Sequence, residues 1–286
     1  MYCRIFLTEK SIIRIAEISV ECENMESGKT RRLRRILGKD SKTLIIAMDH
    51  GVTVGPVHGL EDMHDTVRRV VGGGADAVLM HKGIAKHIDT LRAGLIIHVS
   101  ASTKLGSKPN LKVDVCTVEE AIALGADAVS AHINIGSEEE HLMLSALGSL
   151  SRACDSYGMP LLAMMYPRGP QIKKDNEFDL VSHAARIGAE LGADIVKTLY
   201  TGDVDSFRRV VQSCPVPVVV AGGAQMNNDH EVLLLAEDCT RAGAAGLSFG
   251  RNVFQHKNPE AMSKALAAIV HDGSNAAQAI KLLETS

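Results

Sequence analysis

The sequence predicts a closed (β/α)8 barrel, the α/β fold known as the TIM barrel. Eight short apolar segments alternate with helical segments along the chain, an order typical of βαβ units and a parallel sheet. A five-residue motif recurs at every second one of these segments. The length of 286 residues also suits a single barrel of this kind.

The recurring motif reads Gly-Ala-Asp-Ala-Val at 74–78 and 125–129, Gly-Ala-Asp-Ile-Val at 192–196 and Gly-Ala-Ala-Gly-Leu at 243–247. Each copy has a glycine that can end a helix, followed by residues that can open a buried strand. The copies begin 51, 67 and 51 residues apart. Because the 51-residue interval covers two βα units, the motif marks the even-numbered strands. A doubly wound open sheet is the alternative, and it explains this regularity less well.

The other strands and the helices are predicted between these copies from their apolar periodicity. The four odd-numbered strands are predicted at 43–48, 95–99, 161–165 and 216–221. Helices are predicted at 62–71, 118–124, 142–157, 180–191, 204–212 and 230–242, with closing helices at 265–270 and 276–283.

Residues 1–42 are expected to form an N-terminal extension with a leading helix, and residues 43–286 the catalytic barrel. Met25 is a second plausible start, so residues 1–24 are either an added arm or an over-extended reading frame. A basic run precedes the first strand. We interpret it as the solvated face of a helix, with nucleic-acid binding as the alternative. The basic residues are Lys29, Arg31, Arg32, Arg34 and Arg35, and the expected buried side is Leu33, Ile36 and Leu37.

Composition indicates a cytoplasmic enzyme without a nucleic-acid or membrane partner. The formal net charge is −3, and no apolar run approaches the roughly 20 residues that span a bilayer. The first ten residues lack the apolar core of a signal peptide. Six scattered cysteines form no CxxC pair, which favours reduced, buried thiols over a disulfide framework or a zinc site.

Residues 194–200, Asp-Ile-Val-Lys-Thr-Leu-Tyr, place a lysine inside an apolar run typical of a buried strand. Burial disfavours the ammonium form and lowers the pKa of a lysine, and a neutral amine can attack a carbonyl to form a Schiff base. We therefore predict Lys197 as a covalent catalyst. Two other readings stay open: the side chain could extend out of the barrel wall, or it could pair with an acid. Lys82 is the rival amine, but it lies beside a glycine nearer a solvated loop.

Active sites of such barrels lie at the carboxyl ends of the strands, where Asp49 and Tyr166 are also expected. Both suit proton transfer, although Asp49 could merely cap the next segment and Tyr166 could be an aromatic residue at the rim. The turns Gly222-Gly223 and Gly250-Arg251 follow strands seven and eight, the usual phosphate-binding place in this fold. We expect them to hold a substrate phosphate, with Arg251 supplying a charge-assisted contact.

Other polar and sulfur-containing residues near the strand ends are given structural roles. Four histidines, namely His50, His81, His98 and His132, are expected to be hydrogen-bonded and not to bind a metal. The Met164-Met165 pair is expected to fill the core. Together the site residues permit one mechanism. Lys197 forms an iminium with a ketone, a base removes a hydroxyl proton, and the neighbouring C–C bond breaks to leave an enamine.

The chain resembles the archaeal-type class I aldolases from about Arg34 to its C-terminus. The resemblance is carried by seven motifs in order: MDHGVTVGP (48–56), LMHKGI (79–84), LIIHVS (95–100), MMYPRG (164–169), GADIVKTLYTGD (192–203), VVVAGG (218–223) and FGRNVFQH (249–256). Fructose-bisphosphate aldolases of this family read Asp-His-Gly-Ile-Glu-His-Gly-Pro at the first motif. Here Val54 takes the place of the second histidine, so the chain looks more like the 2-amino-3,7-dideoxy-D-threo-hept-6-ulosonate synthase branch.

The resemblance implies a Schiff-base transaldolase of the alternative route to 3-dehydroquinate and the aromatic amino acids. Its donor would be 6-deoxy-5-ketofructose 1-phosphate, its acceptor L-aspartate 4-semialdehyde, and hydroxypyruvaldehyde phosphate would leave. Lys197 would form the Schiff base, with Tyr166 as proton donor and Asp49 as proton acceptor. The implied donor pocket comprises Asp49, His50, Gly51, Val52, Thr53, Tyr166, Pro167, Arg168, Gly222, Gly223, Gly250 and Arg251. The family also implies a homodecamer. No cofactor or metal is expected, because the iminium withdraws the electrons that a zinc ion would otherwise withdraw.

Two alternatives remain at this level. The chain could be a fructose-bisphosphate aldolase or a related sugar-phosphate aldolase or thiolase, because one residue, Val54, does not decide the substrate. It could also be a barrel that binds a sugar phosphate without catalysis, although the presence of Asp49, Tyr166 and Lys197 disfavours this.

Overall fold

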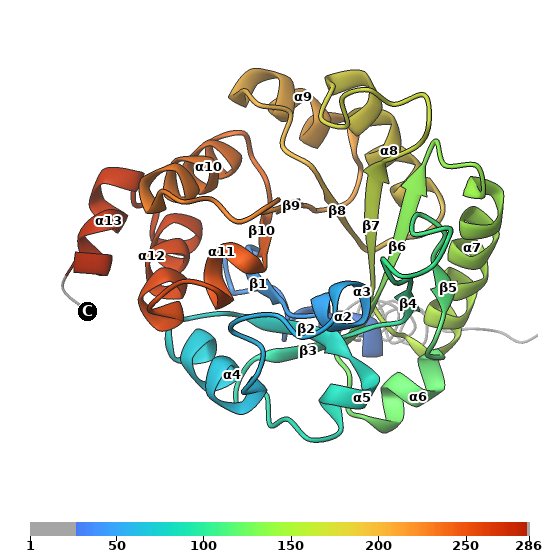
Figure 1. Ribbon diagram of the computed structural model, residues 1–286, viewed down its shortest axis with the longest axis horizontal. Helices are drawn as coiled ribbons and strands as arrows, with labels where there is room; N and C mark the ends of the chain where they lie inside the picture. Colours follow the sequence, from blue (N-terminus) through green and yellow to red (C-terminus); the bar gives the residue numbers. More distant parts are fainter. Residues whose placement is uncertain (1–26, 285–286) are drawn as a thin grey trace, which may run out of the picture.

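The computed structural model describes residues 27–284, and eight parallel strands form a closed barrel surrounded by helices (Figure 1). The predicted (β/α)8 fold is confirmed. The strands follow the order β1-β10-β9-β8-β7-β6-β3-β2 around the barrel. They are β1 (Thr43–Ala47), β2 (Ala77–His81), β3 (Gly94–His98), β6 (Ala128–Ile135), β7 (Leu161–Pro167), β8 (Ile195–Thr198), β9 (Val218–Ala221) and β10 (Gly246–Phe249). A separate antiparallel pair joins β4 (Ser100–Ala101) to β5 (Val113–Asp114).

The longer helices lie where periodicity predicts them, within a few residues at each end. Short helices after strands β1, β2 and β10 were not predicted, since one turn of helix carries no periodic pattern. The helix predicted from residue 265 begins earlier, at Pro259, where Asn258 caps it. The helices are α2 (Gly28–Leu33), α3 (His50–Val54), α4 (Met63–Gly72), α5 (Lys82–Ala85), α6 (Val118–Ala123), α7 (Glu140–Tyr157), α8 (Phe178–Glu190), α9 (Val204–Ser213), α10 (Asp229–Arg241), α11 (Arg251–Phe254), α12 (Pro259–Asp272) and α13 (Ala276–Glu284).

The recurring motif forms the turn into each even-numbered barrel strand. Its glycines, Gly74, Gly125, Gly192 and Gly243, all have a positive φ between 76° and 102°, which a residue with a Cβ adopts only at a cost. The aspartates of the first three copies bind the backbone of a neighbouring odd-numbered strand of the barrel. Their carboxylates accept the backbone N–H of Leu44, Leu95 and Leu161, and their own N–H groups donate to the carbonyls of the same residues.

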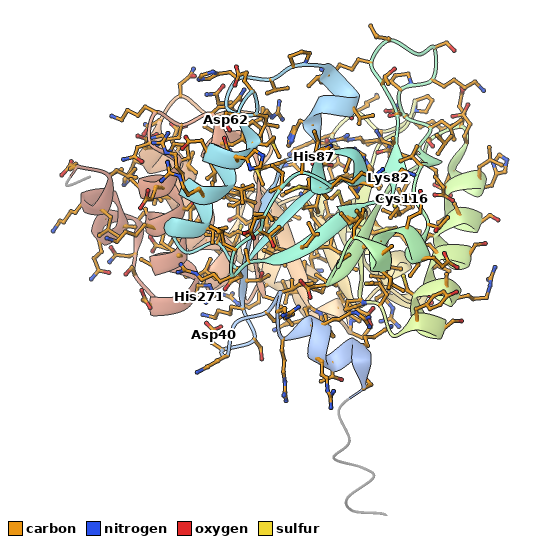
Figure 2. The ribbon with its side chains drawn as sticks, turned by 90° about the horizontal axis from the view of Figure 1, so that it is seen from below. Asp40, Asp62, Lys82, His87, Cys116 and His271 are labelled. Carbon is orange, nitrogen blue, oxygen red and sulfur yellow. The ribbon has the colours of Figure 1, made fainter. Side chains whose placement is uncertain are left out.

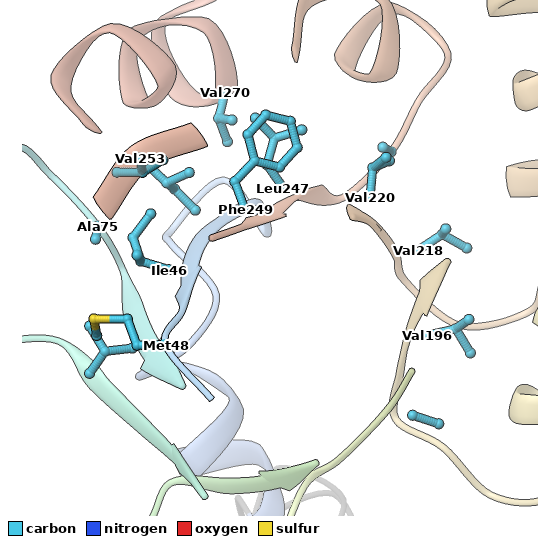
Figure 3. Packing of buried hydrophobic residues seen from close by; sticks show 14 of the residues in the cluster. Ile46, Met48, Ala75, Val196, Val218, Val220, Leu247, Phe249, Val253 and Val270 are labelled. Carbon is cyan, nitrogen blue, oxygen red and sulfur yellow. The ribbon is translucent and has the colours of Figure 1, made fainter. Parts of the chain in front are cut away.

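Two layers of apolar side chains stabilise the barrel. Residues that alternate along each strand point either into the barrel or toward the helices. Figure 3 shows the outer layer, where Ile46, Phe249 and Leu247 pack near Val253 of α11 and Val270 of α12. The inner layer includes Ile45, Leu79, Ile96, Leu162, Met164, Tyr166, Ile195 and Val219.

The amino-terminal end of the barrel is closed by residues 27–42, the leading segment. Ile36 is fully buried in the inner layer, and Leu33 and Leu37 pack against it, as predicted. The basic run lies on the solvent side as interpreted, with Arg35 71% exposed, and three of its residues also bind acids and helix carbonyls at the barrel end. Lys29 pairs with Asp155 at 2.7 Å and Asp194 at 3.1 Å, Arg35 pairs with Asp127, and Arg32 donates to the carbonyls of Tyr157 and Gly158.

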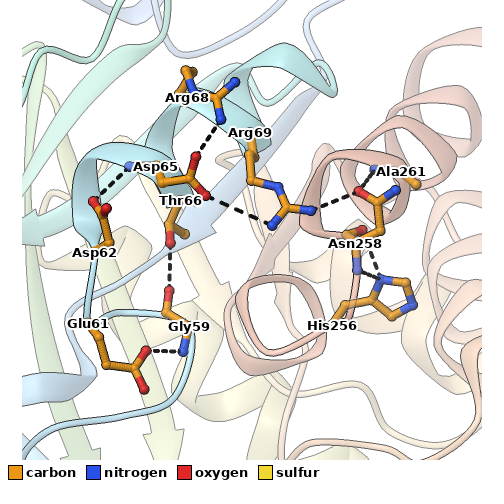
Figure 4. Close-up of polar contacts among 10 residues, drawn as sticks. All are labelled: Gly59, Glu61, Asp62, Asp65, Thr66, Arg68, Arg69, His256, Asn258 and Ala261. Carbon is orange, nitrogen blue, oxygen red and sulfur yellow. Dashed lines mark hydrogen bonds and ion pairs between the residues drawn. The ribbon is translucent and has the colours of Figure 1, made fainter. Parts of the chain in front are cut away.

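Polar contacts connect the helices outside the barrel. Arg69 of α4 forms an ion pair with Asp65 of its own helix and donates a hydrogen bond to Oδ1 of Asn258, the cap of α12 (Figure 4). At the amino-terminal end, His271 of α12 bridges Asp40 and Asp76 at 3.0 and 2.9 Å, and Figure 2 shows Asp40 and His271 together there.

Cys116, Cys154, Cys214 and Cys239 are free and buried, as predicted. The remaining predictions for the thiols and the chain start fall on Cys3, Cys22 and residues 1–24, outside the described residues. No helix in the described range of 27–284 is long and apolar enough to cross a membrane.

Candidate active site

A pocket of about 280 Å³ opens at the carboxyl ends of the barrel strands. Its wall brings together the polar residues expected there with several that were not. The lining residues are Ala47, Asp49, His50, Thr53, Val54, Lys104, Lys112, His132, Met164, Tyr166, Arg168, Lys197, Leu199, Ala221, Gly222, Gly223, Ser248, Gly250 and Arg251.

Lys197 lies at the floor of this pocket. It is on β8, where Ile195 below it belongs to the inner layer and Val196 to the outer one, so the lysine points inward. Its side chain is only 6% exposed. Burial lowers the pKa of the amine to about 8, and the opposing attraction of the Asp49 carboxylate is smaller. Lys197 makes no ion pair with a described residue, so it neither extends out of the wall nor pairs directly with an acid.

Asp49 follows β1 and occupies the N-cap position of α3, yet its side chain makes no capping hydrogen bond. The reading of Asp49 as a mere helix cap is therefore wrong. Its carboxylate lies 3.8 Å from Nε2 of His98 and 3.6 Å from Nδ1 of His50. Burial alone would raise the pKa of Asp49, but His98, His50 and Lys197 outweigh it and lower the pKa to about 2. The group is thus a carboxylate, available to accept a proton.

Tyr166 stands two residues above Met164 on the inner face of β7. Its ring contacts His132 edge-on at 4.8 Å, and the guanidinium of Arg168 lies 5.0 Å from the ring centre. No described residue accepts a hydrogen bond from its hydroxyl, so the alternative of a rim aromatic bonded to a backbone carbonyl is not what the structure shows. Burial raises the pKa of Tyr166 further above its usual value, and the phenol therefore remains a proton donor.

The turns after β9 and β10 form one corner of the pocket. A Cβ on Gly250 would lie 2.7 Å from His50 and 2.8 Å from the Ala47 carbonyl, so only glycine fits there. Three buried polar atoms near this corner have no hydrogen-bond partner among residues 27–284: Nδ1 of His50, Oγ of Ser248 and Nε of Arg251. Buried polar atoms normally have partners, so these three indicate room for a polar ligand group.

The four histidines were expected to be hydrogen-bonded, and the structure agrees for three. His98 bonds Ser130 at 2.8 Å, His81 bonds the His98 carbonyl, and His132 bonds Asn134. The prediction is wrong for His50, because Nδ1 of its ring faces Asp49 beyond hydrogen-bond distance. Within residues 27–284, no three His, Cys, Asp or Glu side chains are grouped to hold a metal ion.

Some predicted residues lie elsewhere. Gly51 and Val52 are exposed on α3, and Pro167 is buried at the end of β7 without lining the pocket. Lys82, the rival amine, is on α5 (labelled in Figure 2). It pairs with Glu120 at 2.6 Å, which raises the pKa of the lysine. It is neither desolvated nor in the pocket, so it does not compete with Lys197.

Sequence reasoning missed several lining residues. Met164 fills the core as expected, but it also forms part of the pocket wall. Lys104 and Lys112 come from the long segment between β3 and β6, where no strand end marks them. Ser248 faces inward on β10, and the alternation of that strand could have revealed it.

Comparison with known proteins decides the family. The family model described as "DeoC/LacD family aldolase" matches residues 43–256, which is most of the chain. The chain belongs to the DeoC/LacD aldolase family. The predicted class I aldolase kinship is thereby confirmed, and the chain is an enzyme of the Schiff-base aldolase type.

Curated relatives of this aldolase cover nearly its whole barrel. A protein of Archaeoglobus fulgidus named 2-amino-3,7-dideoxy-D-threo-hept-6-ulosonate synthase 1 is 51% identical over 85% of this chain and 91% of its own. A synthase of the same kind from Halobacterium salinarum is 46% identical over 87% and 94%. A Streptomyces griseus protein named 2-amino-4,5-dihydroxy-6-oxo-7-(phosphonooxy)heptanoate synthase is 40% identical over 87% and 92%.

Among solved structures, an archaeal fructose 1,6-bisphosphate aldolase superposes with a TM-score of 0.80 at 35% identity, covering 86% of this chain and all of its own. Another archaeal aldolase, 34% identical over 85% of this chain and 99% of its own, also has a TM-score of 0.80. Its catalytic lysine is covalently bound to a carbinolamine intermediate.

Proposed function

We propose that this aldolase is a 2-amino-3,7-dideoxy-D-threo-hept-6-ulosonate synthase. It would transfer a three-carbon ketone fragment from 6-deoxy-5-ketofructose 1-phosphate to L-aspartate 4-semialdehyde. The observation that carries the proposal is the buried amine of Lys197 in one pocket with the Asp49 carboxylate. Support for the substrates comes from the two synthases that are 51% and 46% identical over most of the chain.

The residues suit each step of such a transfer. Neutral Lys197 attacks the donor ketone beside the methyl group, and loss of water gives an iminium that can accept electrons. Asp49 takes the proton of the hydroxyl on the carbon next but one to the iminium carbon. The bond from this hydroxyl-bearing carbon to the carbon next to the iminium then breaks. Hydroxypyruvaldehyde phosphate leaves, and an enamine remains on Lys197.

The enamine carbon next adds to the aldehyde of the acceptor, and the new alkoxide takes a proton from an acid. Tyr166 is placed to provide it, because it lines the pocket, its hydroxyl has no hydrogen-bond partner among the described residues, and burial raises its pKa. Hydrolysis of the iminium releases the seven-carbon product and restores the amine. The donor pocket is proposed to be lined by Asp49, His50, Thr53, Tyr166, Arg168, Gly222-Gly223 and Gly250-Arg251, without Gly51, Val52 and Pro167 of the expected set.

A second candidate function rests on the corner of the pocket formed by Gly222-Gly223 and Gly250-Arg251, the glycine corner. The product named for the Streptomyces griseus relative carries a phosphonooxy group at C7, where the product named for the other two relatives is deoxy. C7 adjoins the carbon bonded to the lysine. The unpartnered atoms of His50, Ser248 and Arg251 beside Gly250 would suit a phosphate at that position. A donor such as dihydroxyacetone phosphate would then replace the methyl ketone.

One comparison of donors tests the proposal. The purified enzyme is given L-aspartate 4-semialdehyde with either 6-deoxy-5-ketofructose 1-phosphate or dihydroxyacetone phosphate, and the products are identified by mass. Fructose 1,6-bisphosphate cleavage is measured alongside. The proposal predicts a preference for the 6-deoxy donor. Preferred formation of a 7-phosphorylated product favours the second candidate, and preferred cleavage of fructose 1,6-bisphosphate contradicts both.

Reduction with borohydride in the presence of the donor, followed by peptide mapping, tests the chemistry itself. The expected adduct is on Lys197 and has the mass of the three-carbon fragment. An adduct on Lys82, or no adduct at all, would contradict Schiff-base catalysis at this pocket. Lys197→Arg is expected to abolish turnover, since its guanidinium stays protonated and cannot act as the nucleophile.

A further inference from the structure

Lys112 and Arg168 form a pair of cations that the mechanism above leaves without a partner. Lys112 is partly buried, and its amine contacts only the hydroxyl of Ser102 among polar side chains of the described residues. Arg168 lies over the Tyr166 ring. Neither forms an ion pair with a described carboxylate. Both line the pocket together with His132, whose pKa is lowered by burial and then by these two charges.

The order of the strands separates this pair from the glycine corner. Lys197 is on β8, with β9 on one side and β7 on the other. Gly222-Gly223 and Arg251 follow β9 and β10 on the first side. Arg168 follows β7 on the second side, next to His132 of β6, which Lys112 approaches. A substrate bonded to Lys197 thus has a cationic group available on either side of it.

In the proposed reaction, the fragments of the donor and the acceptor show on which side of the reacting C–C bond an anion must be bound. Cleavage of the donor sends its phosphate away with the aldehyde fragment, and the enamine retains only a methyl group at its far end. The incoming L-aspartate 4-semialdehyde then occupies the place that the leaving aldehyde vacated. Its carboxylate must lie on the same side of the new C–C bond as the departed phosphate. One cationic site can therefore serve first a phosphate and then a carboxylate.

We propose that Lys112 and Arg168 form this aldehyde-side anion site and bind the carboxylate of the acceptor. The position of the acid supports this side over the glycine corner. Tyr166 protonates the new alkoxide on the aldehyde side of the bond, and the guanidinium of Arg168 lies 5.0 Å from the centre of its ring. The site differs from the sequence-based expectation, in which the glycine turns hold the donor phosphate. The inference rests on the proposed function for the identity of the acceptor.

The test compares a charged with an uncharged acceptor. Hydroxyacetone serves as the ketone, since it gives the same enamine on Lys197 without any phosphate. The acceptors are L-aspartate 4-semialdehyde and butanal. In Lys112→Met, kcat/KM for the semialdehyde is expected to fall at least about tenfold, as for a lost hydrogen bond to a charged group. The value for butanal is expected to stay within about twofold, and Lys112→Arg should recover most of the loss.

Controls separate this effect from general damage. Lys82→Met removes a lysine whose charge is paired outside the pocket, and it should leave both values unchanged. Arg168→Gln should show the same selective loss of kcat/KM for the semialdehyde as Lys112→Met. It provides an independent test if Lys112→Met is unstable. An equal loss with both acceptors, or no loss with either, overturns the proposal.

Failure of the proposed function gives a different result. The wild-type enzyme would then not add hydroxyacetone to aspartate semialdehyde at all. In that case the comparison uses glyceraldehyde 3-phosphate against glyceraldehyde, with dihydroxyacetone phosphate as the ketone. A selective loss for the phosphorylated aldehyde in Lys112→Met would still support the anion site, and an unselective one would overturn it.

Discussion

A buried lysine attacks a ketone only in its neutral form, so the surroundings of Lys197 set the pH at which the reaction begins. Its pKa is lowered to about 8, mainly by burial. The rate of trapping hydroxyacetone on the enzyme with cyanoborohydride should rise with pH and reach half its maximum near pH 8. A midpoint near the ordinary lysine value would show that the amine is solvated.

The same measurement with Asp49→Asn tests the neighbouring charge. The carboxylate of Asp49 favours the ammonium form and so raises the pKa of Lys197 against the effect of burial. Its removal should move the midpoint of trapping to lower pH, while turnover of the full reaction is lost with the base. A shift toward higher pH would mean that Asp49 does not act on the amine.

Tyr166 is expected to matter for proton transfer and not for formation of the Schiff base. Tyr166→Phe removes only the hydroxyl, which has no described partner, and keeps the ring against His132. We expect kcat to fall by roughly 10²–10⁴-fold, the usual contribution of a positioned acid or base. Trapping on Lys197 should continue at a similar rate. Loss of trapping together with turnover would instead point to a collapsed pocket.

At the scale of the element, the recurring motif stabilises the end of the barrel opposite the site. Asp127 holds the backbone of Leu95 and the guanidinium of Arg35, and its side chain is only 9% exposed. Asp127→Ala leaves the Leu95 N–H unpaired and should lower the free energy of unfolding by about 1–3 kcal/mol. KM for the substrates should not change. Denaturant unfolding and steady-state kinetics measure the two effects.

Asp155→Ala is the matched control for this prediction. Asp155 also pairs with a basic residue of the leading segment, but its side chain is 66% exposed. A solvated ion pair contributes about 0–1 kcal/mol, so this variant should remain close to the wild type. Equal destabilisation of both variants would argue that the hydrogen bond from Leu95 to Asp127 contributes little to the free energy of unfolding.

Elements that repeat or alternate could be predicted from the sequence, and those set by tertiary contact could not. The barrel, its even-strand motif and the rim position of Asp49, Tyr166 and Lys197 follow from periodicity and from the rule for strand ends. Lys112 could not be found this way, because only the fold of the segment after β3 brings it to the pocket. Nor could the ion pairs of Lys29, since its partners lie more than a hundred residues away in sequence.

At the scale of the whole molecule, half-buried His271 and buried Lys197, at opposite ends of the barrel, give stability an opposite dependence on pH. His271 lies between Asp40 and Asp76, whose hydrogen bonds and charges raise its pKa from 6.5 to about 9. A pKa raised in the folded state stabilises fully below pH 6.5, and this contribution is lost as the pH rises through 9. Lys197 has a pKa lowered from 10.5 to about 8, so burying its charge destabilises below pH 8 and this cost disappears by pH 10.5.

Thermal unfolding should therefore show a minimum at moderately alkaline pH. The melting temperature is expected to fall between pH 6.5 and 8, before deprotonation of Lys197 begins to offset the loss. His271→Asn, which cannot be protonated, should remove the fall and lower the melting temperature at pH 6.5 by roughly a few degrees. Lys197→Met should raise stability below pH 8 and leave the fall due to His271 in place. A melting temperature that is independent of pH over this range in the wild type, or unchanged by His271→Asn, would show that the bridge between α12 and the amino-terminal end of the barrel contributes little to its stability.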